Sequence, residues 1–118
     1  MQSPRQRVSL RLARDRRRVV DLDDVYFLEA SGTATLVRLR GAKRLRDVRG
    51  LGELLAGLED RGFVRIHRSY AVNLARVREL RLQRDGVDWE VKLDPPVNRV
   101  LPVSRSELES VVERIDRL

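Results

Sequence analysis

Short runs of alternating apolar and polar residues recur along most of this 118-residue chain, and they limit the folds open to it. Residues 7–12, RVSLRL, place Val8 and Leu10 on one face, and residues 35–40 and 63–67 alternate in a similar way. Because successive side chains of a strand point to opposite faces, this alternation predicts short, half-buried β-strands. About nine such segments occur, without the intervening helices that a parallel sheet requires. We therefore expect a mainly β, β-rich α+β domain of packed antiparallel sheets.

Two segments have the period of a helix instead. Between Gly50 and Gly62, leucines recur at the i, i+3, i+4, i+7 spacing of one helix face: Leu51, Leu54, Leu55 and Leu58. Near the C-terminus, Ser104 precedes Glu107 by three residues, which is the spacing of a capping box. The next apolar stripe consists of Leu108, Val111, Val112, Ile115 and Leu118. Both helices are expected to be short and to pack on the core.

Small and polar residues mark the turns between the expected strands. Residues 84–86, Arg-Asp-Gly, separate apolar runs at 77–82 and 87–93 and favour a tight hairpin turn. Residues 41–42 form the turn of a basic hairpin. Residues 30–34 form a small polar turn at which a backbone can approach a neighbour closely.

Chain length and rare residue types exclude several classes of protein. A chain of this length forms one domain, residues 1–118, and buries roughly two-thirds of its unfolded surface. There is no cysteine and His67 is the only histidine, which argues against disulfides, zinc sites and a His-based catalytic triad. No apolar run approaches the ~18 residues of a membrane span, and the first residues lack the apolar core of a signal peptide. We expect a cytoplasmic protein without cofactor or metal, with residues 1–6 as a disordered basic tail.

The positive charge is unevenly distributed. The net charge is +7, of which residues 1–18 contribute +6 through seven arginines and one acid, Asp15. Two further basic blocks lie at residues 38–49, with Asp47 as the single acid, and at residues 61–84, with Glu79 as the single acid. One basic face with a compensating face elsewhere is typical of a polyanion binder. The alternative is a solvated surface that is merely rich in arginine.

Residues 63–80, FVRIHRSYAVNLARVREL, combine a short strand with a cationic end. The alternating half brings His67, Arg68 and Ser69 to the end of the strand, and apolar residues anchor the turn after it. Polar side chains on a rigid base form a binding device. Tyr70 and Asn73 are expected to be structural, through packing and local backbone bonding.

Three blocks, in this order, resemble the LytTR family of bacterial DNA-binding domains: FLEASGTATLV, IHRSYAVNLARV and LPVSRSEL. The resemblance covers residues 7–118, and the pair HRSxxVN and PVSR, about thirty residues apart, is its most specific part. It implies an elongated domain of about ten short strands in three antiparallel sheets with two short helices. It also implies a transcription regulator that binds duplex DNA by inserting loops into the major groove.

The resemblance also assigns the residues that contact DNA. Arg105 and Arg68 match positions that reach base edges, and a guanidinium fork suits O6 and N7 of guanine. Thr35 matches a third base-reading position, where a threonine offers only one hydroxyl contact or contact with a thymine methyl. Five further residues match loop positions near the phosphates: Ser31, Thr33, His67, Ser69 and Ser104. His67 could equally orient its turn by a structural hydrogen bond, and either arginine could be a solvated charge.

The resemblance further implies the partners. The family commonly binds paired direct repeats, so two copies on one DNA site are expected, with a receiver or sensor domain of a two-component system as input. No paired carboxylates or activated nucleophile can be identified, so an enzyme is not expected. The alternative is a module that binds nucleic acid or an anionic surface without reading sequence. With five aromatic residues, stacking platforms for single-stranded RNA are scarce.

Overall fold

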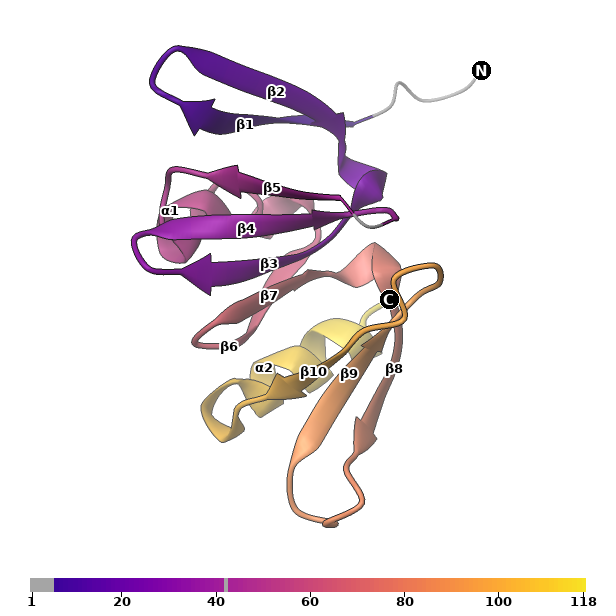
Figure 1. Ribbon diagram of the computed structural model, residues 1–118. Helices are drawn as coiled ribbons and strands as arrows, with labels where there is room; N and C mark the ends of the chain where they lie inside the picture. Colours follow the sequence, from indigo (N-terminus) through magenta and orange to yellow (C-terminus); the bar gives the residue numbers. More distant parts are fainter. Residues whose placement is uncertain (1–5, 42) are drawn as a thin grey trace.

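The computed structural model describes residues 6–41 and 43–118. In this part of the chain, ten strands form three antiparallel sheets, which succeed one another from the N-terminal hairpin to a C-terminal sheet (Figure 1). Two α-helices complete the domain. The predicted fold class is therefore confirmed. The radius of gyration is 14.2 Å, against about 13.5 Å for a compact domain of this length, which agrees with a somewhat elongated shape.

The middle sheet has five strands in the order β5-β4-β3-β7-β6. Their bounds are Val25–Ser31 (β3), Ala34–Leu39 (β4), Arg44–Asp47 (β5), Phe63–His67 (β6) and Tyr70–Asn73 (β7). Both faces of this sheet are covered, so neighbouring residues of one strand enter different cores. Leu28 packs in the core shared with α1 (Leu51–Ala56), whereas Phe27 packs in the core shared with the C-terminal part.

The N-terminal hairpin consists of β1 (Arg7–Ala13) and β2 (Arg16–Asp21). Val8 and Leu10 of β1 are buried in the first core, as their alternation predicts. The hairpin does not continue the middle sheet, but β1 lies beside β5, where Val48 N donates a hydrogen bond to Arg11 O (2.9 Å).

The C-terminal sheet has the order β10-β9-β8, with β8 at Val77–Leu82, β9 at Trp89–Leu93 and β10 at Val100–Val103. Helix α2 (Arg105–Asp116) packs against β6 and buries Val111 completely. Asn73, at the end of β7, is almost fully buried. Its side-chain Oδ1 accepts a hydrogen bond from Ala75 N (3.1 Å), which confirms the predicted local backbone bonding. Its amide also donates to the distant Leu22 O (3.2 Å) and Val25 O (2.9 Å).

Several local predictions need correction. Helix α1 ends at Ala56, and a turn and the 3-10 helix Glu59–Arg61 lead to Gly62, whose φ is +93°. Leu58 is nevertheless buried with the other three leucines. The capping box does not form, because the Ser104 side chain makes no cap bond and its Oγ lies 3.3 Å from Ser106 Oγ.

The turn between β8 and β9 is longer than predicted and spans residues 83–88. The Asp85 carboxylate accepts hydrogen bonds from Val87 N (2.8 Å) and Asp88 N (3.0 Å), which stabilise a loop rather than a two-residue turn. Val87 is 57% exposed and is not a core residue.

The predicted tail, residues 1–6, lies outside the described residues except for Gln6. Gln6 O accepts a hydrogen bond from Leu22 N (2.9 Å), so this residue is held by the fold. Ala42 of the predicted turn at residues 41–42 also lies outside the described residues. None of the described helices combines the length and apolar character that crossing a membrane requires.

Candidate nucleic-acid interface

Four segments far apart in the sequence end at one edge of the molecule, which we call the loop edge. It consists of the β1–β2 turn, the β3–β4 turn, the β6–β7 turn and the start of α2, all on the left in Figure 1. Two backbone hydrogen bonds join three of these segments. Ala30 N at the end of β3 donates to Ser69 O (2.8 Å), and Ser104 N donates to Ile66 O (2.8 Å). The loops are therefore fixed relative to one another.

The β6–β7 turn is stabilised by hydrogen bonds from the Arg65 side chain and carries one exposed cation, Arg68. Arg65 donates through Nε to His67 O (3.3 Å) and through Nη2 to Arg68 O (2.8 Å). Within the turn, His67 Nδ1 accepts a hydrogen bond from Ser69 N (3.1 Å). The Arg68 side chain is exposed, and among the described residues no carboxylate pairs with it. The supporting role of Arg65 was missed at the sequence level, because it lies on a strand of alternating pattern like any exposed charge.

The start of α2 presents a second exposed guanidinium. The Arg105 side chain is 79% exposed, and its Nε lies 3.5 Å from the Asp88 carboxylate of the β8–β9 loop. A pair this open to solvent is weak. The amides of the first helical turn have no partner within the helix, so they and the helix dipole favour an anion here.

The β6–β7 turn and the start of α2 enclose a shallow pocket of about 360 Å³. The residues that line it come from both segments: Arg65, His67, Arg68, Ser104, Ser106 and Glu107. Three of the predicted site residues, at positions 67, 68 and 104, therefore line one cavity. Arg105 directly follows Ser104, the last of these three residues, in the chain.

The β3–β4 turn carries two further predicted residues in accessible positions. Thr33 is exposed and Ser31 is half-buried. Between them, Gly32 has a φ of +60°, a conformation that favours glycine and allows the tight reversal.

Thr35 does not lie at the surface. Its side chain is fully buried, and its hydroxyl donates to Arg49 O (2.9 Å). A buried hydroxyl that already has its acceptor cannot reach a base edge, so the predicted base-reading role of Thr35 is inconsistent with this structure. We assign Thr35 a structural role in the sheet.

A buried ion pair connects the N-terminal hairpin to the loop edge. Asp47 is fully buried and accepts hydrogen bonds from Arg49 Nε (3.0 Å), Nη2 (2.8 Å) and N (2.9 Å) and from Arg11 N (2.9 Å). Arg49 Nη2 also donates to Ser9 O (3.1 Å) of β1. The sequence analysis identified Asp47 only as the lone acid of a basic block, and that isolation was the available signal.

These contacts determine the ionisation of Asp47. Burial raises the pKa of its carboxyl, but the hydrogen bonds from the Arg49 side chain and from the Arg49 and Arg11 amides outweigh burial. The net pKa lies below the ordinary value, so Asp47 is charged at neutral pH. The same pair raises the pKa of Arg49.

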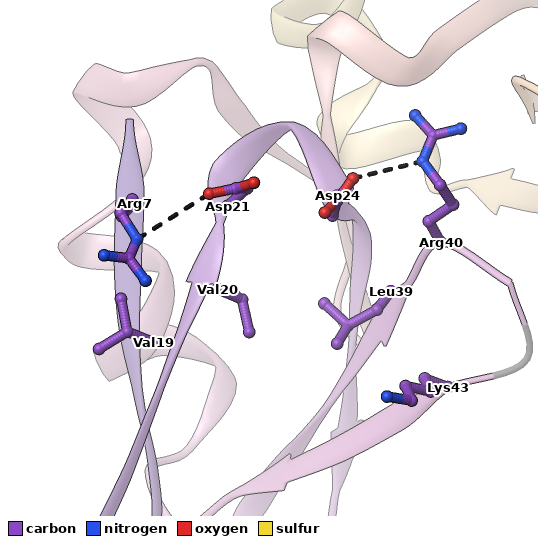
Figure 2. A pocket seen from close by; sticks show the side chains of 8 residues that line it. All are labelled: Arg7, Val19, Val20, Asp21, Asp24, Leu39, Arg40 and Lys43. Atoms are coloured by element: carbon purple, nitrogen blue, oxygen red, sulfur yellow. Dashed lines mark hydrogen bonds and ion pairs between the residues drawn. The ribbon is translucent and has the colours of Figure 1, made fainter. Parts of the chain in front are cut away.

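The opposite edge of the molecule, which we call the far edge, is chemically different. It contains the β4–β5 turn, residues 22–24, residues 74–76 and the β9–β10 loop. A pocket of about 340 Å³ lies there, and Figure 2 shows the charged side chains around it. Asp24 pairs with Arg40 (3.3 Å), and Asp21 lies 3.9 Å from Arg7. Of the three cations around this cavity, Arg7 and Arg40 thus have acidic partners and Lys43 is the third, so the cavity offers an anion little net attraction.

Among the described residues, no three His, Asp or Glu side chains are grouped so that they could hold a metal ion.

Comparisons with known proteins agree with the resemblance seen in the sequence. A model of the LytTr DNA-binding domain family matches residues 15–116 of this chain. Among solved structures, the chain is similar to the LytTr DNA-binding domain of a Bacillus cereus protein described as a methyl-accepting/DNA response regulator. The TM-score is 0.74 at 21% sequence identity, over 95% of this chain and 98% of the other. No curated protein matches this sequence. The structural similarity shows a shared fold.

Proposed function

The chain belongs to the LytTr family of DNA-binding domains, and from this premise we propose that it reads a specific duplex DNA sequence as a bacterial transcription regulator. In this proposal three segments of the loop edge enter the major groove, namely the β3–β4 turn, the β6–β7 turn and the start of α2, and Arg68 and Arg105 contact base edges. Membership of a DNA-binding family makes the domain a binding module rather than a catalytic one. The residue assignments are the part that this proposal adds.

The observation that carries the proposal is the pair of exposed guanidiniums on two fixed neighbouring segments. Arg68 lies on a turn held by Arg65, and Arg105 lies on a helix start bonded to β6 through Ser104 N. Each arginine can donate two hydrogen bonds in a fixed fork to guanine O6 and N7. Because the backbone segments that carry the two arginines are fixed, little backbone conformational entropy is lost on binding.

Phosphate contacts position such a domain without reading sequence. We assign this role to Ser31, Thr33, Ser69 and Ser104, whose hydroxyls lie on or beside the three loops. His67 joins them through its free ring nitrogen. Since Nδ1 accepts from Ser69 N, the neutral ring carries its proton on Nε2 and can donate it to a phosphate oxygen. Thr35 is not part of the proposed interface.

The proposal includes how the domain is used. Two copies bind paired direct repeats in the cytoplasm, and a receiver or sensor partner supplies the signal. The solved relative with the same fold is described as a response regulator, which supports an output role of this kind for the present chain.

The test begins with selection of binding sites from random duplexes, and affinity is then measured on the selected site. Arg68→Ala and Arg105→Ala should each weaken binding by about 1–3 kcal/mol and relax preference at separate base pairs. Arg40→Ala, at the far edge, is the matched control and should leave the preference unchanged. Footprinting on the selected duplex should reveal two protected repeats.

The same measurements distinguish sequence-specific binding from the alternative, unspecific binding of polyanions. A reader of sequence keeps its preference over competitor DNA while its affinity falls steeply with salt. Selection that yields no enriched site, or loss of binding without any change in base preference for both arginine variants, would overturn the proposal.

A further inference from the structure

The N-terminal hairpin carries a second group of cations, and Arg14, Arg16 and Arg17 of this group lie at or beside its turn on the loop edge. Residues 7–18 contain six arginines and a single acid, Asp15, and all six side chains are exposed: Arg7, Arg11, Arg14, Arg16, Arg17 and Arg18. Arg7 pairs with Asp21 at 3.9 Å, and Arg17 donates to the turn carbonyls Ala13 O and Arg14 O. Within the described part of the chain, no carboxylate forms an ion pair with the other four.

This group cannot be explained by core packing or by internal charge balance. Core packing in the hairpin comes from Val8 and Leu10, which are buried, whereas Arg14 and Arg16 extend from the turn into solvent. Several like charges close together on a small hairpin repel one another. They therefore destabilise the free protein unless an anion neutralises them.

The hairpin is rigidly placed with respect to the proposed base-reading loops. Asp47 accepts from Arg11 N, Arg49 reaches Ser9 O, and Val48 N donates to Arg11 O, so β1 is bonded to the end of β5. Asp47, at the end of β5, lies opposite Thr35 of the neighbouring strand β4, close to the β3–β4 turn. The hairpin turn therefore faces the same way as the three loops (Figure 1).

The spacing fits the backbone of a single duplex. Adjacent strands of a sheet lie about 4.8 Å apart. At this spacing across the middle sheet, and with a similar distance from β5 to the adjoining hairpin, which is not part of the sheet, the β6–β7 turn and the β1–β2 turn lie about 24 Å apart. A duplex that lies along the loop edge advances about 3.4 Å per base pair, so this distance equals about seven base pairs. The hairpin tip would then meet phosphates beyond the groove that Arg68 enters.

We propose that the β1–β2 hairpin is a second phosphate-binding element, which holds the DNA backbone about seven base pairs to one side of the base-reading loops. This inference rests on the proposed function and extends it, because it adds an asymmetric flank to the DNA site. The matched family residues begin at position 15, so β1 lies outside them. Here Arg14 and Arg16 act as contacts that supply affinity and no sequence information.

The test removes two charges and monitors the salt dependence of binding. Wild type and R14Q/R16Q are titrated by fluorescence anisotropy, from low to moderate salt, on the selected duplex and on an unrelated duplex of about 40 base pairs. Losing two phosphate contacts per protein should reduce the salt slope by about 1.8 for each bound copy on both duplexes. A fourfold rise in salt then costs the variant roughly twelvefold less affinity than it costs wild type. The preference for the selected sequence should stay unchanged.

Two controls separate a DNA contact from other effects. K43Q/R117Q removes the same charge from exposed positions away from the loop edge and should change the slope by less than half as much. R14K/R16K keeps the charge and should keep the wild-type slope. Arg14 and Arg16 are exposed and repel the other hairpin cations, so R14Q/R16Q should melt no lower than wild type, and weaker DNA binding cannot then result from unfolding.

Trimming the selected duplex tests the placement. Shortening one flank to fewer than about seven base pairs should weaken wild type and leave R14Q/R16Q unaffected, whereas trimming the other flank should affect both equally. The proposal is overturned if R14Q/R16Q keeps the wild-type slope or changes no more than K43Q/R117Q. It is also overturned if neither flank matters. A wild type without sequence preference refutes the proposed function instead, while the slope on the unrelated duplex still tests the hairpin.

Discussion

The loop edge and the far edge are both rich in arginine, yet they use it differently. At the far edge, Arg40 pairs with Asp24 (3.3 Å) and Arg76 donates to Asp23 O (2.7 Å). Both guanidiniums also lie close to the face of the Tyr26 ring, at 5.7 and 5.2 Å from its centroid.

At the loop edge, by contrast, cations are presented rather than neutralised. Arg14, Arg16 and Arg68 pair with no carboxylate among the described residues, and Arg105 has only the loose contact with Asp88 at 3.5 Å. Arg17, Arg49 and Arg65, which donate to partners within the fold here, hold the loops in place. The number of arginines on a surface therefore does not indicate whether that surface can bind an anion. What matters is whether each arginine already has a partner within the protein.

The largest expected effect concerns the ion pair that fixes the hairpin to the loop edge. Asp47→Ala leaves the Arg49 guanidinium and the Arg11 amide without their acceptor. Removing one member of a buried pair costs about 3 kcal/mol here, the low end of the usual range because Arg49 is partly exposed. Urea unfolding at neutral pH measures the loss. Asp24→Ala at the far edge is the control and should cost less than about 1 kcal/mol; equal losses would contradict the comparison.

The next effect separates a supporting arginine at each edge. Arg65→Ala removes two hydrogen bonds from the β6–β7 turn, and Arg76→Ala removes one from Asp23 O. Each should reduce stability by about 1–2 kcal/mol. Only Arg65→Ala should also weaken DNA binding, by roughly tenfold, since it loosens the turn that carries Arg68. Arg65→Lys should restore part of that affinity.

This pair of variants can also refute the distinction between the edges. If Arg65→Ala and Arg76→Ala weaken binding to the same extent, the supporting contacts act only through overall stability. Affinity is therefore measured well below the melting temperature of both variants.

Lowering the pH should weaken the same ion pair, with a smaller loss of stability than Asp47→Ala causes. Because the folded-state pKa of Asp47 is below its ordinary value of 3.8, its contribution to stability is complete above about pH 5. The contribution is lost as pH falls through the folded-state pKa. The difference in unfolding free energy between wild type and Asp47→Asn should therefore shrink between about pH 5 and acid pH. A constant difference would mean that the charge of Asp47 adds nothing.

The smallest effect concerns the acid beside Arg105. Asp88→Asn should release Arg105 from its 3.5 Å contact and strengthen DNA binding by about two- to fivefold, the range expected for an exposed pair. Asp24→Asn removes an equal charge at the far edge and should change affinity less. Weaker binding of Asp88→Asn would indicate that Asp88 positions Arg105 for DNA instead of competing with DNA.

Local pattern predicted the elements well because strands and helices have their own periods. The alternation of residues 63–67 identified β6 at its observed place, and the leucine spacing after Gly50 identified the start of α1 but not its end at Ala56. Where local signals failed, a competing local partner existed. Ser106 takes the contact of Ser104 that a capping box would need, and Asp85 closes a longer loop than Asp-Gly alone suggests.

The candidate site could be predicted only in part, and the reason is burial. Arg68, Arg105 and Thr33 are exposed, as a contact residue must be. Thr35 lies two residues after Thr33, yet it is buried, and its hydroxyl donates a hydrogen bond to Arg49 O, fourteen residues away in the chain. Sequence position gave no indication of this partner.

By itself, the sequence determined the mainly β fold, the two helices and the family, and it indicated the segments that carry the proposed binding loops, because these depend on local periodicity and short motifs. Tertiary structure alone decided which arginines are free to meet DNA. Arg49 bonds Ser9 across 40 positions and Arg76 bonds Asp23 across 53, so neither partner can be found from neighbouring residues. A charge is available to a ligand only when the folded chain offers it no acceptor, and that depends on contacts between distant residues.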